Sequence, residues 1–308
     1  MFYSMTNNLL STRNIILVFV LFLFSFTTAS ALNPVNFDND GKSDLSVYRQ
    51  GFWLVLRSET NTFFAVQWGI NTDTYAPGDY DGDGITDLTV FRRETGVWWS
   101  RRSSDGQLFA IQWGTGIDKL VPADYDGDGK TDFAVFRPDD GYWYILKSSA
   151  NFEPFYFRWG KFGDQPIPAD YDGDGKADLA VFRVTENHWY IVDSSTGNYR
   201  VINFGAGICC ADLAMPSDYT GDGKADLAIY RGDGVWFFKR SEDGAEYSRQ
   251  FGLIDEPPIY KVPADYDGDG ITDLGLFNRG RWYIYNSSTN TQSNYTFGGA
   301  IDYPLQSS

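Results

Sequence analysis

The amino-acid sequence predicts an all-β protein, a β-propeller of six four-stranded blades. One block of residues recurs six times, at steps of 43 to 48 residues. Each copy holds short segments rich in Val, Ile, Phe, Tyr and Trp between Gly, Asp, Ser and Pro. Such segments are typical of strands. A period of this length suits a propeller blade or a solenoid turn, and four short strands per unit favour the blade. A seven-bladed ring and an unclosed arc are the alternatives.

Each copy opens with a proline and an aspartate-rich loop, in its fullest form Pro-x-Asp-Tyr-Asp-Gly-Asp-Gly-x-x-Asp-Leu. The copies start near residues 34, 77, 122, 168, 216 and 263. Val-Phe-Arg or a variant follows, then a tryptophan, a serine five residues later, and an aromatic-Gly pair. The tryptophans are Trp53, Trp98, Trp143, Trp189, Trp236 and Trp282. We predict that they pack between blades, with stacking on sugars as the alternative.

Four strands are expected in each unit: one around the proline, one after the Asp loop, one with the tryptophan and one ending at the aromatic-Gly pair. A proline is tolerated in the first of these because an innermost strand is an edge. The C-terminal segment 297–304 follows the path between blades and stops where another Asp loop would start. We therefore expect the last residues to pair beside Pro34 and close the ring.

The N-terminal segment predicts a cleaved signal peptide. Arg13 precedes an apolar run from Ile15 to Phe26, and the small residues Ala29-Ser30-Ala31 follow. The run is too short for a membrane-spanning helix, which needs about 20 apolar residues. The expected organisation is a signal peptide at 1–31 and a propeller at 32–308, with no membrane span in the mature chain. Such a protein is secreted to the extracellular space or the cell surface, with the periplasm as an alternative.

The charge distribution points to bound cations. The formal net charge is −16, and more than half of the 41 acidic residues are aspartates of the six loops. This balance argues against a nucleic-acid partner, and carboxylates clustered so densely are costly unless neutralised. The only two cysteines, Cys209 and Cys210, are adjacent and cannot form a stapling framework. A structural loop pair is favoured over a redox switch.

The loop spacing predicts calcium. Carboxylates stand at positions 1, 3, 5 and 9, a glycine stands at position 6 and a backbone carbonyl is available at position 7, as in an EF-hand loop without its final glutamate. Four loops are complete, two are weaker, and up to six calcium ions are expected. The candidate ligands, loop by loop, are Asn36, Asp38, Asp40, Lys42 and Asp44; Asp79, Asp81, Asp83, Ile85 and Asp87; Asp124, Asp126, Asp128, Lys130 and Asp132; Asp170, Asp172, Asp174, Lys176 and Asp178; Asp218, Thr220, Asp222, Lys224 and Asp226; and Asp265, Asp267, Asp269, Ile271 and Asp273.

A plain tight turn is the other interpretation of such a loop, because Asp and Gly dominate turns for backbone reasons. Turn chemistry does not require the same carboxylate register in six copies. The Lys and Ile at position 7 would contribute their carbonyl oxygen. Hard oxygen ligands and the absence of His and Cys from every loop select calcium over zinc.

The repeat resembles the FG-GAP/VCBS repeat of integrin α-subunit propellers and of many secreted bacterial proteins. Phe204-Gly205 and Phe251-Gly252 match the family's Phe-Gly, and the Asp loops match its calcium loop. The resemblance spans Pro34 to Pro304. Two features depart from it: Val-Phe-Arg stands where the family often has Gly-Ala-Pro, and six units stand where seven blades are usual. The resemblance implies calcium binding and binding of an extracellular protein or glycan.

We expect a binding module, for adhesion, scaffolding or partner binding, and not an enzyme. The only histidine, His188, falls at a position that varies from blade to blade and is expected at the surface. The acids outside the loops, Glu94, Asp139, Asp140, Glu186 and Glu256, show no shared spacing. A lectin-like, carbohydrate-binding propeller is the main alternative, because repeated Trp and Arg can form equivalent sugar sites. A polysaccharide-acting enzyme domain is the weaker one.

Overall fold

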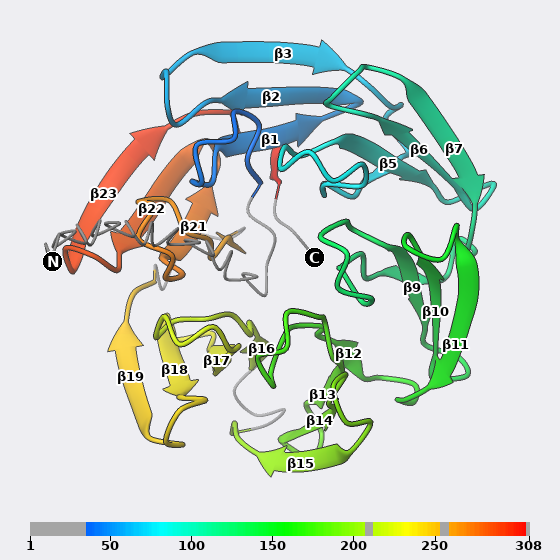
Figure 1. The fold of residues 1–308 in the computed structure, drawn as a ribbon. Helices are drawn as coiled ribbons and strands as arrows, with labels where there is room; N and C mark the ends of the chain where they lie inside the picture. Colours follow the sequence, from blue (N-terminus) through cyan, green and yellow to red (C-terminus); the bar gives the residue numbers. More distant parts are fainter. Residues whose placement is uncertain (1–34, 207–211, 253–258, 306–308) are drawn as a thin grey trace, which may run out of the picture.

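Six antiparallel sheets form a closed ring in the computed structural model (Figure 1). The structure describes residues 35–206, 212–252 and 259–305, and every regular element in these ranges is a strand. In these ranges no helix is long and apolar enough to cross a membrane. The predicted signal peptide at 1–31 and the Cys209-Cys210 pair lie outside the described residues.

Each blade has four strands, which follow one another from the axis outward. Blade 1 holds β24 (Tyr303–Pro304), β1 (Leu45–Arg49), β2 (Phe52–Leu56) and β3 (Phe63–Gln67), and blade 2 holds β4 (Thr74–Tyr75), β5 (Leu88–Arg92), β6 (Val97–Arg101) and β7 (Leu108–Gln112). Blade 3 holds β8 (Lys119–Leu120), β9 (Phe133–Arg137), β10 (Tyr142–Lys147) and β11 (Glu153–Arg158), and blade 4 holds β12 (Gln165–Pro166), β13 (Leu179–Arg183), β14 (His188–Val192) and β15 (Tyr199–Asn203). Blade 5 holds β16 (Leu213–Ala214), β17 (Leu227–Tyr230), β18 (Val235–Lys239) and β19 (Glu246–Gln250), and blade 6 holds β20 (Tyr260–Lys261), β21 (Leu274–Asn278), β22 (Arg281–Asn286) and β23 (Thr291–Thr296).

The C-terminal strand closes the ring. β24 pairs with β1, with Tyr303 opposite Tyr48 and Pro304 opposite Val47. The N–H of Leu305 extends the pairing by donating to the carbonyl of Ser46. Closure of the ring by the last residues is therefore confirmed, although they pair with β1 and Pro34 lies outside the described residues. The seven-bladed and unclosed alternatives are wrong.

The innermost strands lie before the repeated prolines and not around them, which corrects the prediction. In blade 2, β4 ends at Tyr75, and the chain still pairs at Ala76, whose N–H donates to the carbonyl of Thr89. Pro77 has no N–H to donate, so the regular ladder stops there. Pairing resumes as an isolated bridge between Gly78 and Asp87.

The six repeated tryptophans form the core between blades. Each is fully buried, and its indole N–H donates to the carbonyl of the aromatic residue in the same blade's aromatic-Gly pair, at 2.7–3.0 Å. In one cluster Trp143 of blade 3 packs with Leu179 and Val181 of blade 4. A fully buried indole has no face for a sugar, so the packing interpretation of these six residues is confirmed.

The repeated arginines pair with buried aspartates. In blade 3, Arg137 at the end of β9 bonds through Nε to Asp118, which precedes β8 and whose carboxylate is fully buried, at 2.8 Å. The guanidinium of Arg137 also lies over the ring of Tyr144, 4.2 Å from its centroid. The five pairs are Arg49–Asp302, Arg92–Asp73, Arg137–Asp118, Arg183–Asp164 and Arg231–Asp212. Each pair connects the start of an innermost strand to the end of the second strand in the same blade.

Sequence reasoning missed these aspartates, although they share a spacing. Four of them, such as Asp118, stand four residues before a repeated proline and 19 before their arginine. Blade 6 lacks both partners, because Asn278 replaces the arginine and Ile259 occupies the position of the aspartate. The pair is therefore absent as a unit in the one blade that lacks the arginine.

We predict that the pair can be exchanged as a unit. Arg137→Asn alone leaves the Asp118 carboxylate buried without its counter-charge and should lower the free energy of unfolding by about 3 kcal/mol. The double variant Asp118→Ile with Arg137→Asn copies Ile259 and Asn278 of blade 6 and should lose less than half as much. Urea denaturation measures both. If both variants lose the same free energy of unfolding, the charge pair is not what stabilises this part of blade 3.

Candidate metal centres

The six Asp loops form a hydrogen-bonded ring near the centre of the molecule (Figure 1). In blades 2 to 6 each loop joins the innermost strand to the next strand of its blade, and in blade 1 the loop leads into β1, so all six lie at the same end. The N–H at loop position 8 donates to the carbonyl at position 1 of the preceding loop, at 2.6–2.8 Å in all six blades. The donor and acceptor pairs are Thr86–Asn36, Thr131–Asp79, Ala177–Asp124, Ala225–Asp170, Thr272–Asp218 and Ser43–Asp265. Each candidate metal site is thus connected directly to the next.

Glycine at loop position 4 lets neighbouring loops approach closely. Gly82 has φ +85°, a conformation that residues with a side chain rarely adopt. A Cβ there would lie 2.9 Å from Cε of Lys130, the position-7 residue of the next loop. The side-chain stem of Lys130 therefore covers the preceding loop.

The carboxylate at position 1 folds the loop on itself. Oδ1 of Asp79 accepts the N–H of Gly82 at 2.6 Å, and Oδ2 accepts the N–H of Gly84 at 2.8 Å. The same bonds recur in the loops that start at Asp124, Asp170, Asp218 and Asp265. Burial raises the pKa of Asp79, and the charges of Asp83 and Asp81 raise it further against these hydrogen bonds.

The carboxylate at position 9 is buried and joins two parts of the blade. Asp87 is fully buried; its Oδ2 accepts the N–H of Tyr80, and its Oδ1 accepts the N–H of Ser103 at 2.7 Å. Burial raises the pKa of Asp87 to about 7, and the nearby charge of Asp81 adds to the shift. Burial likewise raises the pKa of Asp132 and Asp178 to about 7, and that of Asp44 and Asp273 to about 6.

The repeated serines hold the loops, a role that sequence reasoning missed. The sequence showed only their fixed spacing after the tryptophan. Besides the N–H bond to position 9, each serine hydroxyl donates to the aspartate at position 5, at 2.6–3.0 Å. The serines are Ser58, Ser103, Ser148, Ser194, Ser241 and Ser287.

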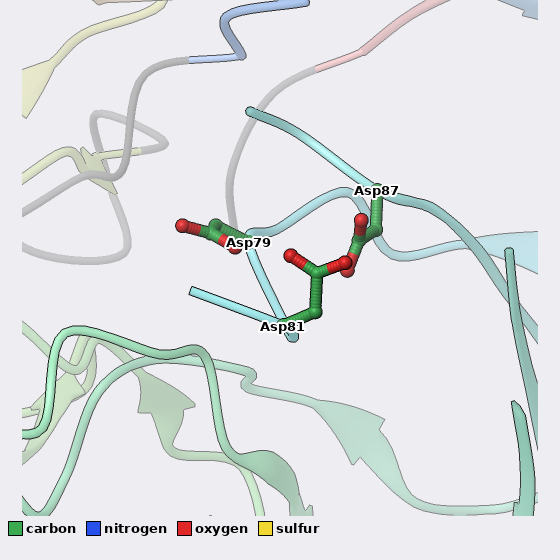
Figure 2. Close-up of side chains that lie close together, drawn as sticks. All are labelled: Asp79, Asp81 and Asp87. Carbon is green, nitrogen blue, oxygen red and sulfur yellow. The ribbon is translucent and has the colours of Figure 1, made fainter. Parts of the chain in front are cut away.

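The carboxylate at position 3 keeps one oxygen without a partner. Oδ2 of Asp81 accepts the hydroxyl of Ser104 at 2.6 Å, whereas Oδ1 is buried and has no hydrogen-bond donor. Among the described residues the same Oδ1 atom is also unpaired in Asp38, Asp126 and Asp267. Figure 2 shows Asp81 between Asp79 and Asp87, with its carboxylate directed at that of Asp87. A buried carboxylate oxygen without a donor needs a cation or another partner.

The structure brings three of the four predicted carboxylates together in each complete loop. Positions 1, 3 and 9 offer oxygens within 4.8 Å of one another in blades 2, 3 and 4, and positions 1, 3 and 5 do so in blade 6. Asp83, at position 5, accepts the Ser103 hydroxyl, which also lies 3.4 Å from the carbonyl of Ile85. In the described residues no such triad forms in the loops with Asn36 and Thr220. Four Asp triads can hold a metal ion.

His188 lies outside these centres, in β14. It is half-buried, which corrects the expectation of a surface position. Its ring lies 6.0 Å from that of Tyr190, and its buried Nδ1 has no hydrogen-bond partner within the described ranges. No serine or carboxylate bonds to it there, so this geometry contains no nucleophile-base pair.

Solved structures share the propeller fold. A lectin from Agrocybe aegerita that recognises non-reducing terminal N-acetylglucosamine matches 91% of this chain and 84% of its own, at 16% identity and a TM-score of 0.58. A virginiamycin B lyase from Staphylococcus aureus, in a structure with quinupristin, matches 90% of this chain and 86% of its own, at 9% identity and a TM-score of 0.56. At such identities the likeness concerns the fold alone.

A search of curated protein sequences finds no match. The model of the FG-GAP-like repeat matches residues 79–135 and 124–181. Each match begins at position 1 of an Asp loop and runs through the next loop into the strand that follows it. The same loop, arginine, tryptophan and serine recur in the blades outside the matched segment, apart from Asn36, Thr220 and Asn278 at three of the repeated positions. The chain thus carries FG-GAP-like repeats over residues 79–181 and folds as a six-bladed β-propeller.

Proposed function

We propose that this chain is a calcium-binding propeller that acts outside the cell as an adhesion, scaffold or partner-binding module, and not as an enzyme. The observation that carries the metal assignment is the buried, unpaired Oδ1 at position 3, which recurs in four loops. A chance gap in hydrogen bonding would not select the same atom of the same loop position four times. A cation placed against this oxygen removes the cost of leaving it unpaired.

The ligand chemistry favours calcium. Positions 1, 3 and 9 supply carboxylate oxygens, with position 5 and the position-7 carbonyl beside them, and hard oxygen ligands in a flexible loop suit calcium. The ion would neutralise carboxylates that now lie within 4.8 Å of one another. It would also fasten the loop to the serine of the adjacent hairpin. Extracellular modules of this kind bind calcium at roughly 10⁻⁴ to 10⁻³ M.

The proposed binding role depends on the outer strands and grooves that stay accessible when the inner loops hold calcium. The predicted signal peptide places the chain outside the cell. Calcium at the inner loops would stabilise the blades while leaving their outer strands and grooves free to contact an extracellular protein or glycan. Propellers support many functions, so the fold itself does not choose the partner.

Carbohydrate binding is the second candidate, on a different basis from the repeated tryptophans. Exposed tyrosines lie beside half-buried tryptophans in two consecutive grooves: Tyr156 with Trp113, and Tyr199 with Trp159, each with ring centroids 5.9 Å apart. The tyrosines are 54% and 70% exposed, so they can stack on a pyranose face. A glycan array on the calcium-loaded protein tests this candidate, and binding lost in the Tyr156→Ala and Tyr199→Ala variants would support it.

Calcium should raise the melting temperature strongly. At 5 mM calcium each occupied loop contributes about 1–2 kcal/mol, and four complete loops should together raise the melting temperature by roughly 5 °C or more over the value in chelator. Magnesium at the same concentration should do much less, because it requires near-ideal octahedral geometry. Differential scanning calorimetry measures the shift. No shift with calcium would sink the metal assignment.

One loop should be separable from the others by a matched pair of variants. Asp126→Asn removes the negative charge of the carboxylate whose Oδ1 is unpaired. It should reduce the calcium-dependent rise in melting temperature without lowering the melting temperature in chelator. Asp139→Asn removes the same charge from an exposed turn outside the loops and should leave the calcium response unchanged. A loss of stability in chelator for Asp126→Asn would mean that this carboxylate is structural without metal.

Stability without metal should fall as pH rises from about 4 to about 7. The pKa of Asp87, Asp132 and Asp178 is raised to about 7 in the folded state, against about 3.9 for an unfolded aspartate. Between these values the folded chain binds more protons than the unfolded chain, so stability decreases with rising pH. In chelator, the melting temperature at pH 7.5 should lie roughly 5 °C or more below that at pH 5. Calcium should remove most of this difference, because it takes the place of the protons.

A further inference from the structure

The groove between blades 1 and 2 contains a pocket of about 380 Å³ with an apolar floor and a basic rim. Phe64 and Val66 of blade 1 and Leu88 of blade 2 contribute to the floor, and three arginines, Arg57, Arg101 and Arg102, line the rim. We propose that this pocket binds a small organic acid, whose carboxylate the arginines hold and whose body lies on the apolar floor. The volume falls within the range of small-molecule sites.

None of the three arginines has a counter-ion among the described residues. Within the described ranges no carboxylate lies within ion-pair distance of any of them, whereas Arg240, at the same blade position as Arg57 and Arg102, pairs with Asp243. Arg57 stacks on Phe64, 4.9 Å from the ring centroid, and its buried Nε has no hydrogen-bond partner in the described structure. An arginine held by stacking alone gains hydrogen bonds when an oxyanion reaches its guanidinium edge.

Two other grooves of the ring are filled or smaller. Between blades 2 and 3, Phe133 takes the place of Leu88 as the first residue after the Asp loop, and it stacks with Phe109, with ring centroids 5.7 Å apart. Phe152 packs against Phe109 there, with ring centroids 5.2 Å apart. The corresponding pocket between blades 5 and 6 measures about 150 Å³, and its Arg249 lies over Tyr285. The pocket of blades 1 and 2 is thus larger than that of blades 5 and 6, and no aromatic stack of this kind fills it.

The chemistry of the pocket favours a carboxylate on a body with an apolar face. The planar guanidinium fork matches a carboxylate in bidentate geometry, and the phenyl and aliphatic floor excludes a fully hydrated inorganic ion. A long polyanion would meet the repulsion of a chain with a formal net charge of −16, so a small acid or a single acidic residue fits better. An aliphatic acid and a sugar acid share this chemistry.

Isothermal titration calorimetry at one fixed calcium concentration tests the proposal with two matched pairs of probes: hexanoate against hexanamide, and D-glucuronate against D-glucose. At least one carboxylate should bind in the range of roughly 0.1–1 mM, and its neutral partner at least tenfold more weakly. Preference for hexanoate would identify an aliphatic acid as the ligand type, and preference for glucuronate a sugar acid.

Variants locate the binding. Arg57→Gln and Arg102→Gln should each weaken it at least tenfold, while Arg240→Gln, at the matched position of blade 5, should leave it unchanged. Leu88→Phe copies Phe133 of the neighbouring groove and should abolish binding by filling the floor, with all three arginines kept. Melting temperatures confirm that each variant is folded. Equal binding of charged and neutral probes, no binding at all, or an equal loss in Arg240→Gln would overturn the proposal.

Discussion

The buried aspartate at loop position 9 is the point on which the rest of each blade depends. In blade 2, Asp87 accepts one N–H from its own loop, at Tyr80, and one from the hairpin beyond the tryptophan, at Ser103. The adjacent Thr86 donates to the carbonyl of Asn36 in the preceding blade. The buried carboxylate of Asp87 therefore joins its own loop to the hairpin, and the adjacent Thr86 joins that loop to the preceding blade. Burial of this carboxylate is unfavourable in the ionised form, so a bound cation or a proton would stabilise it.

The arrangement places stability and binding in different layers of the molecule. The loops near the axis are linked from blade to blade by short backbone hydrogen bonds, so an ion bound in one loop would also fix a residue to which the next loop donates. The outer strands take no part in that ring. The acid pocket lies between these layers, because Ile85 and Thr86 of the blade 2 loop belong to its lining. The segment that contains Ile85 and Thr86 thus belongs both to the Asp loop of blade 2 and to the lining of the pocket.

Much of this architecture was predictable from the sequence, because repetition removes ambiguity. Six copies of one pattern indicated the blade count, the strand order and the loops, and the buried tryptophans followed from their fixed position. Features that depend on contacts between distant positions were not predictable in the same way. The serines and the aspartates exemplified by Asp118 were given no role from the sequence, since their partners are distant along the chain, 16 to 20 residues away in blade 3. The pocket depends on side chains that meet in a single groove, among them Arg57, Arg101 and Arg102, and no repeat pattern reports a combination of that kind.

The pairing of β24 with β1 has a consequence for how the protein is made. Blade 1 takes its outer three strands from residues 45–67 and its innermost strand from residues 303–304, so the strands of one sheet come from segments far apart in the sequence. Until residues 303–304 leave the ribosome, β1 presents an unpaired edge, and such edges invite pairing with other chains. Blades 2 to 6 can form in the order in which they are translated, but closure must wait for residues 303–304. A chain that stalls or is truncated before these residues would therefore leave β1 as an unpaired edge and would not form a smaller closed propeller.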